Sequence, residues 1–304
     1  MDSRQQDTRR FSGGRWLIVM ATLLWSMSGL FAKSPLFEAW PEGDRGILFA
    51  FWRAAFASIV LWFLVRRVEW DWRLLVSALT FAFMNVTYLS SMVYCEATLA
   101  IWLQYTSPMW VLLISFFFFG ERPTRKEWPD WTLICLGVLV VLFCQPRSAS
   151  VWGIVLGLMS GLGFAGVVIT LRWLRHLDGA WVVFVNHFFT ALILLPLVMR
   201  IGIWPKGFQW GMLAGFGMLQ MGLPYALFAR AIKRVNSHEA SALTLLEPMF
   251  VPVWVLFSYG GLASYQRPSF GTLAGASLIL GGLGIRYLRL AWGARQTTSG
   301  TPTT

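Results

Sequence analysis

The chain has 304 residues, of which 57% are hydrophobic and only 13% are charged, and its mean hydropathy is +0.60. A soluble globular chain is about 45–50% apolar and about 25% charged, so the composition excludes a soluble enzyme, a disordered chain and a disulfide-stapled secreted domain. The net charge of +11 comes from Lys and Arg residues that are dispersed between apolar runs, a layout that argues against nucleic acid as a partner. This composition is typical of a protein that crosses a membrane several times.

Ten apolar stretches are long enough to cross a bilayer as helices, which takes about 20 residues each. The polar, basic residues 1–15 form a predicted N-terminal tail, and the first stretch lacks a clear small-residue cleavage site, so we interpret it as an uncleaved span. The Thr- and Ser-rich tail, 291–304, is expected to be disordered. The predicted spans are 16–32, 46–65, 73–93, 98–119, 129–145, 151–171, 180–199, 210–231, 239–258 and 269–289.

The distribution of Lys and Arg predicts the orientation of these spans. If the N-terminus is cytoplasmic, the inner segments hold 18 of the 25 basic residues, the outer segments hold six, and Arg53 lies within a span. Basic residues accumulate in cytoplasmic loops. The sequence therefore predicts a multi-pass protein with both termini in the cytoplasm.

The gap between residues 145 and 151 divides the spans into two sets of five, and the second set repeats the first. Pro108-Met109 matches Pro248-Met249 at an offset of 140 residues, and Gly120 matches Gly260. Because five is odd, the second copy must enter the membrane from the opposite face. The predicted fold is an all-α membrane protein with two inverted five-helix repeats, 16–145 and 151–290, a design typical of secondary transporters.

Five short motifs occur in order and at spacings that agree with the repeat. They are Trp25-Ser26, Phe51-Trp52-Arg53, Thr106-Ser107-Pro108, Gly120-Glu121-Arg122 and Leu246-Glu247-Pro248. With these motifs, residues 15–290 resemble the drug/metabolite transporter superfamily, specifically its ten-span EamA-type carriers. The chain departs from that pattern at Gly260-Gly261, where the family often repeats Gly-Glu.

The resemblance implies transport of a small metabolite, often an amino acid or a drug, through the inner membrane. It also implies that helices 1–4 and 6–9 surround a central cavity, with helices 5 and 10 at the periphery.

Two opposite charges within the spans are the main candidates for binding a solute, since intramembrane charges are costly and mark function. Arg53 could hold a carboxylate through two parallel hydrogen bonds. Glu247 precedes Pro248 and could bind a proton or an ammonium group; its repeat partner, Ser107, is uncharged, so a proton site would be single. Together they predict a zwitterion such as an amino acid. The structural alternatives are an Arg tied to helix-end carbonyls and a Glu paired with Arg53 or with a hydroxyl.

Further candidates are polar or aromatic residues that could line the cavity, or else hydrogen-bond helices to one another. An offset of 134 places His187 opposite Arg53, and Pro108 and Pro248 are expected to break helices. The remaining candidates are Trp25, Asn85, Tyr88, Gln104, Tyr105, Ser107, Gln220 and Tyr225.

Other functions fit the sequence less well. A membrane-embedded enzyme would need a metal set or a catalytic triad, but the chain has only three His, and its three Cys lack metal-ligand spacing, so no metal or cofactor is predicted. A nucleotide-sugar carrier would need more basic residues within spans, and ATP drive would need a P-loop lysine. An uncoupled facilitator of small solutes is the alternative function that the sequence leaves open. The sequence predicts proton-coupled export of a small solute, with the bilayer and protons as further partners.

Overall fold

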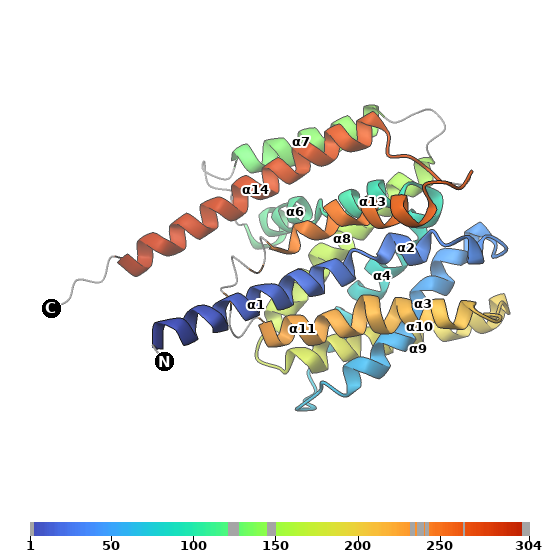
Figure 1. The fold of residues 1–304 in the computed structure, drawn as a ribbon, viewed down its shortest axis with the longest axis horizontal. Helices are drawn as coiled ribbons and strands as arrows, with labels where there is room; N and C mark the ends of the chain where they lie inside the picture. Colours follow the sequence, from blue (N-terminus) through green and yellow to red (C-terminus); the bar gives the residue numbers. More distant parts are fainter. Residues whose placement is uncertain are drawn as a thin grey trace.

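The structure is a computed structural model that describes residues 3–120, 128–144, 150–231, 235, 240, 243–263 and 265–299. Within these ranges every regular element is helical (Figure 1). The elements of the first half are α1 (Ser3–Trp25), α2 (Ser28–Ala32), the short 3-10 helix η1 (Pro35–Phe37), α3 (Glu42–Trp62), α4 (Arg73–Tyr94), α5 (Ala97–Gln104), α6 (Ser107–Phe119) and α7 (Trp128–Phe143). Those of the second half are α8 (Val151–Trp173), α9 (Gly179–Ile201), α10 (Gln209–Gly217), the π-helix η2 (Met218–Gly222), α11 (Leu223–Ala231), α13 (Leu246–Tyr259) and α14 (Phe270–Ser299).

In the described ranges, eight helical segments are long and apolar enough to cross a membrane, and α7 and α13 are apolar but shorter. The all-helical membrane architecture expected from the composition is thus confirmed. In the stretch predicted at 239–258, α13 begins at Leu246, and the described residues Ala240, Leu243 and Thr244 before it are also helical. Pro248 lies in the first turn of α13, where proline is tolerated because that turn needs no N–H donor. Residues 236–239 and 241–242 lie outside the described residues.

The two ends of the chain differ from the predicted tails. Helix α1 begins at Ser3, within the stretch expected to be a polar tail. Helix α14 continues to Ser299, past residue 291, where we expected disorder to begin. Residues 291–296 include Ala, Arg and Gln, which favour helix, and the stretch 291–301 contains no proline. The first residues of α1 and the last of α14 lie at the same end of the molecule (Figure 1).

The packing between helices follows the repeat. When each helix of a packed pair is replaced by its counterpart in the other half, the result is again a packed pair. Helix α4 packs on α8, and the corresponding pair is α11 on α1. The pairs α3 with α9 and α7 with α14 correspond to themselves. Such a pattern is what two related copies joined about a pseudo-two-fold axis would produce, and it places the buried groups of both halves against each other.

Close approach of α4 and α8 depends on glycine. A Cβ atom added to Gly163 of α8 would lie 2.9 Å from the Cα atom of Met84 of α4. Small residues allow helix backbones to approach in a membrane, where no hydrophobic force drives them together.

Helices α7 and α14 lie side by side at one edge of the molecule (Figure 1). An ion pair between the buried carboxylate of Asp130 on α7 and Arg289 on α14 joins them. The guanidinium of Arg286 lies 5.4 Å from the ring centroid of Trp131, which adds a cation–π contact. This pair therefore has its own polar contacts at the periphery of the fold.

Several helices are interrupted within the apolar region. Helix α1 ends at Trp25 before α2 begins, and α5 ends at Gln104 before α6 begins at Ser107. Pro108 is the second residue of α6, where its missing N–H is no loss. Gly120 ends α6 with a φ of +67°, which glycine adopts without strain; Glu121 and Arg122 of the same motif lie outside the described residues.

Candidate functional site

Arg53 is a buried guanidinium, only 2% exposed, near the middle of α3. It donates a hydrogen bond to the amide oxygen of Asn85 on α4. The amide nitrogen of Asn85 in turn donates to the backbone oxygen of Ala50 at 3.2 Å, which fixes the orientation of the amide. The Nε atom of Arg53 has no partner among the described residues. The neutral amide orients the guanidinium without neutralising its charge, which leaves it able to bind an anion.

Aromatic rings from both halves surround this guanidinium. Its Cζ atom lies 5.9 Å from the ring centroid of Tyr88 on α4 and 5.2 Å from that of Phe216 on α10. Ring faces attract cations, so these rings lower the cost of burying the charge. The Tyr88 hydroxyl forms a 3.0 Å hydrogen bond with the hydroxyl of Ser28, which connects α4 to α2.

Glu247 lies in the first turn of α13 and accepts a hydrogen bond of 2.9 Å from the hydroxyl of Tyr105. Tyr105 lies in the interruption between α5 and α6, so this contact joins the two halves of the chain. The same hydroxyl lies 3.2 Å from the backbone oxygen of Thr244, which is an alternative acceptor. The carboxylate is thus paired with a neutral hydroxyl, one of the two structural alternatives expected from the sequence.

Arg53 and Glu247 do not neutralise each other. Both are described, and no ion pair within 4.0 Å joins them. Their charges nevertheless interact through the interior, and the phenols of Tyr88 and Tyr225 lie in the field of both. The interior therefore contains a separated pair of opposite charges with polar and aromatic groups nearby.

A third group of candidates gathers at the end of α1. The ring of Trp25 meets that of Tyr225 edge-on at 5.2 Å between centroids, and Tyr225 lies 5.9 Å from His187. The amide nitrogen of Gln220, in the π-helix, donates to the backbone oxygen of Trp25 at 2.7 Å. The buried Trp25 Nε1, His187 Nε2 and Gln220 Oε1 have no partner among the described residues. Unpaired buried polar atoms are costly, so these three atoms mark a place where hydrogen-bonding capacity is unused by the described residues.

The structure does not bring every candidate into these groups. Gln104 and Ser107 are buried on either side of the α5–α6 interruption, but no hydrogen bond described for this chain joins them to the charged residues. Pro108 and Pro248 lie in the first turns of α6 and α13, immediately after the points where the helical path is interrupted.

Sequence reasoning missed several neighbours of the candidates. Ser26 and Ser28 carry hydroxyls within an apolar span, a signal that could have marked them as candidate site residues. Ser28 contacts Tyr88, and Ser26 accepts a hydrogen bond of 2.8 Å from Trp254 Nε1. Phe216 and Trp254 carry no such signal, because apolar aromatics are abundant throughout this chain.

A membrane protein that holds unpaired charges between two related halves belongs, as a class, with the membrane transporters. The chain itself belongs to the EamA-like transporter family, which matches residues 12–143 and again residues 151–287. The resemblance seen in the sequence motifs is therefore confirmed.

Individual relatives agree with this assignment. An uncharacterized transporter from Archaeoglobus fulgidus is 26% identical over 280 residues, which cover 90% of this chain and 96% of that protein. The pseudopaline exporter CntI from Pseudomonas aeruginosa is 25% identical over 240 residues, covering 76% of this chain and 82% of that protein. A solved crystal structure has the same fold, with a TM-score of 0.60 at 19% identity, covering 91% of this chain and 97% of the other.

Proposed function

We propose that this transporter exports a small zwitterionic metabolite, with amino acids as the simplest class, across the inner membrane by alternating access coupled to protons. The observation that carries the proposal is the separation of Arg53 from Glu247: each is held by neutral partners, and each lies in the field of the other. A zwitterion would satisfy both, with its carboxylate on Arg53 and its ammonium group at Glu247. In a water-poor interior such charge-assisted hydrogen bonds are stronger than neutral ones.

The same proposal includes ten spans in two inverted repeats with both termini in the cytoplasm. It is supported by the exchangeable helix pairs, by the two matches to the family and by the location of both chain ends at one end of the molecule. Two halves that are alike but oppositely oriented can expose one site first to one face and then to the other.

Contacts between α13 and the first helices are suited to opening and closing such a site. Trp254 Nε1 donates to Ser26 at 2.8 Å, and the Tyr259 hydroxyl donates to the backbone oxygen of Leu30 at 2.8 Å. Both acceptors lie at or after the interruption between α1 and α2. A movement of α13 would break these two hydrogen bonds and would also shift the buried Val251 and Val255 against Gly29.

Glu247 is the candidate for proton coupling. Its repeat partner Ser107 cannot ionise, so the two halves provide one carboxylate between them. A proton on Glu247 would remove the group that holds the ammonium of the solute, so that proton and solute occupy the site in turn. The exporter among the relatives supports outward movement of the solute.

The test is efflux of a radiolabelled mixture of proteinogenic L-amino acids from proteoliposomes, with and without an inward proton gradient. Losing one hydrogen bond to a charge costs about 1.5–3 kcal/mol, so Arg53→Gln and Glu247→Gln should each slow efflux by about 10- to 100-fold. Exposed residues supply matched controls, Arg200→Gln and Glu69→Gln, which should leave efflux unchanged. Normal efflux in both central variants would refute the zwitterion site, and efflux independent of the gradient would favour an uncoupled facilitator.

Asn85→Asp makes a sharper variant, because it keeps the size of the side chain and places a carboxylate beside Arg53. The resulting ion pair should occupy the guanidinium, so we expect efflux to fall as far as in Arg53→Gln. The variant loses the hydrogen bond to Ala50 and gains the ion pair, so its folding is checked by thermal unfolding. Wild-type efflux in a folded Asn85→Asp variant would show that Arg53 does not bind the solute.

A further inference from the structure

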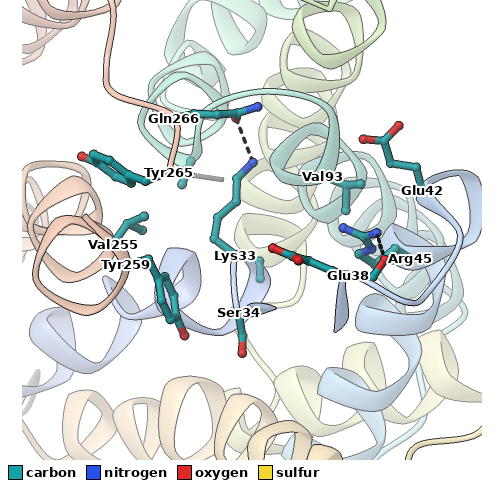
Figure 2. Close-up of a pocket in the computed structure, with 12 residues that line it drawn as sticks. Lys33, Ser34, Glu38, Glu42, Arg45, Val93, Val255, Tyr259, Tyr265 and Gln266 are labelled. Carbon is teal, nitrogen blue, oxygen red and sulfur yellow. Dashed lines mark hydrogen bonds between the residues drawn. The ribbon is translucent and has the colours of Figure 1, made fainter. Parts of the chain in front are cut away.

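A charged cavity is lined by residues that follow α2 and precede α14, and not by the central residues. The end of α2 and the start of α14 lie at the end of the molecule opposite the ends of the chain (Figure 1). The cavity has a volume of about 210 Å³. Figure 2 shows the charged and polar side chains that line it: Lys33, Glu38, Glu42, Arg45, Tyr265 and Gln266. The first four come from the first half and the last two from the second half, so the cavity spans both repeats.

Lys33 immediately follows α2 and extends across the cavity towards Gln266 (Figure 2). Its ammonium group donates to the amide oxygen of Gln266 at 3.2 Å. An ammonium group has three donors, so two of them are unused by the described residues. No carboxylate forms an ion pair with Lys33 among the described residues. Lys33 is therefore a cation on the cavity wall with free hydrogen-bonding capacity.

Arg45 supplies a second cation on the same wall. Its Nε donates to the backbone oxygen of Trp40 at 3.1 Å, and its Nη2 donates to the backbone oxygen of Glu38 at 3.0 Å. These backbone contacts fix the plane of the guanidinium without neutralising its charge. Nη1 has no hydrogen-bond partner among the described residues, which leaves a donor in a fixed position.

The cavity also contains the opposite charge. Glu38 and Glu42 line it, and neither carboxylate forms an ion pair with Lys33 or Arg45 within 4.0 Å. Two cations and two carboxylates on one wall give no net charge, so the lining suits a solute that carries both signs. The volume is below the roughly 300–1,000 Å³ of pockets for drug-sized ligands, so the solute must be compact.

We propose that this cavity is an outer subsite that binds a compact zwitterion, with the carboxylate of the solute on Lys33 and Arg45 and its ammonium group towards Glu38 and Glu42. The inference rests on the proposed function, because it assigns a second binding position to the same class of solute. The subsite would receive the solute after it leaves the central residues, or before it reaches them when transport runs inwards.

The test uses acylation of Lys33 by sulfosuccinimidyl acetate, followed by mass spectrometry on the protein in lipid nanodiscs. The probe is N,N-dimethylglycine, a zwitterion whose tertiary amine forms no stable amide with the reagent. We expect the rate at Lys33 to fall about tenfold when the probe is present at ten times its half-protecting concentration, as mass action requires. Lys206 lies on an exposed loop outside the cavity and should react at an unchanged rate in the same sample.

Variants separate this subsite from the central one. Arg45→Gln and Glu42→Gln should each raise the half-protecting concentration by about tenfold, since each removes one charged contact. Arg200→Gln is the matched exposed control and should not change it. In Arg53→Gln, protection of Lys33 should persist even though efflux is slowed by about 10- to 100-fold. If Arg53→Gln and Glu247→Gln both show normal efflux, the proposed function fails, while protection at Lys33 still measures binding at the subsite.

Three results would overturn the inference. The first is an absence of protection at Lys33. The second is equal protection by propionate, which would indicate a simple anion site. The third is loss of protection in Arg53→Gln, which would show that occupancy of the central residues acts on Lys33 from a distance.

Discussion

Lys33 carries a residue-scale prediction about pH. Burial lowers the pKa of its ammonium group to about 8, and the nearby charge of Arg45 acts in the same direction, while Cys95, Glu96 and Glu42 oppose the shift. The charged groups on the surrounding elements are Glu38, Glu42, Arg45 and Glu96. Acylation needs the neutral amine, so its rate at Lys33 should rise with pH with a midpoint near 8. Protection by a zwitterion should weaken above that pH, because the cation that binds its carboxylate is lost.

The measurement is the rate of Lys33 acylation between pH 6 and 11, corrected for the pH dependence of the reagent itself. A midpoint at the ordinary lysine value of 10.5 would mean that water reaches the ammonium group freely. That outcome would contradict the lowered pKa of the Lys33 ammonium group.

At the scale of residues, the sequence singled out the candidates for the proposed central site but not the contacts between them. Arg53, Asn85 and Tyr88 could be singled out because polar groups are rare and costly in apolar spans. That Asn85 orients Arg53, and that Tyr105 donates to Glu247, could not be predicted, since each pairing depends on how separate helices pack. The cavity at Lys33 was missed because its charged residues lie between the predicted spans, where charged residues are common.

Gly163 provides a prediction at the scale of helices. A methyl group there would meet backbone atoms of Met84, which cannot move aside as a flexible side chain could. We expect Gly163→Ala to separate α4 from α8 and to destabilise the fold by about 1–3 kcal/mol, visible as a lower thermal unfolding temperature in detergent.

Gly281→Ala is the matched control, because it also lies inside a helix and a methyl group there meets nothing within 4 Å. It should leave the unfolding temperature unchanged or raise it slightly, since alanine favours helix over glycine. If both variants unfold at the same temperature, the backbones of α4 and α8 are not in close contact at Gly163.

Regular helices were predictable from hydropathy, and their irregularities were not. The stretch predicted at 73–93 is α4 (Arg73–Tyr94), and that at 151–171 is α8 (Val151–Trp173). The hydropathy of the sequence does not reveal the interruption after Trp25 or the π-helix at Met218–Gly222. They are stabilised by a tertiary contact, Gln220 to the backbone oxygen of Trp25, so local sequence preference alone does not determine them.

The orientation of the whole molecule is a prediction open to chemical labelling. In a background without native cysteines, Arg4→Cys and Arg295→Cys should react with a membrane-impermeant maleimide only after the cells are permeabilised. Lys206→Cys, on the opposite side in this topology, should react in intact cells. Labelling of both tail positions in intact cells would reverse the orientation, and opposite sides for the two tails would exclude an even number of spans.

At the scale of the molecule, the repeat predicted that two halves exist but not how they pack. An offset of 140 residues relates Pro108 to Pro248 without indicating that α4 meets α8 or that α7 meets α14. Those pairings arise only when both copies fold together. The cavity at Lys33 likewise forms only when Lys33 and Gln266 come together, and these residues lie more than two hundred positions apart along the chain.

The two halves correspond in how their helices pair but not in the charges that they carry. This difference has a consequence for transport rates, because microscopic reversibility constrains them. Without a driving gradient, the ratio of maximal rate to half-saturating concentration must be equal for passage in either direction. If Lys33 and Arg45 bind the solute tightly at the outer face, inward transport would have a low half-saturating concentration and, in the same proportion, a low maximal rate. Cells that face high external solute would then suffer little backflow through this protein, even when the force that drives export is weak.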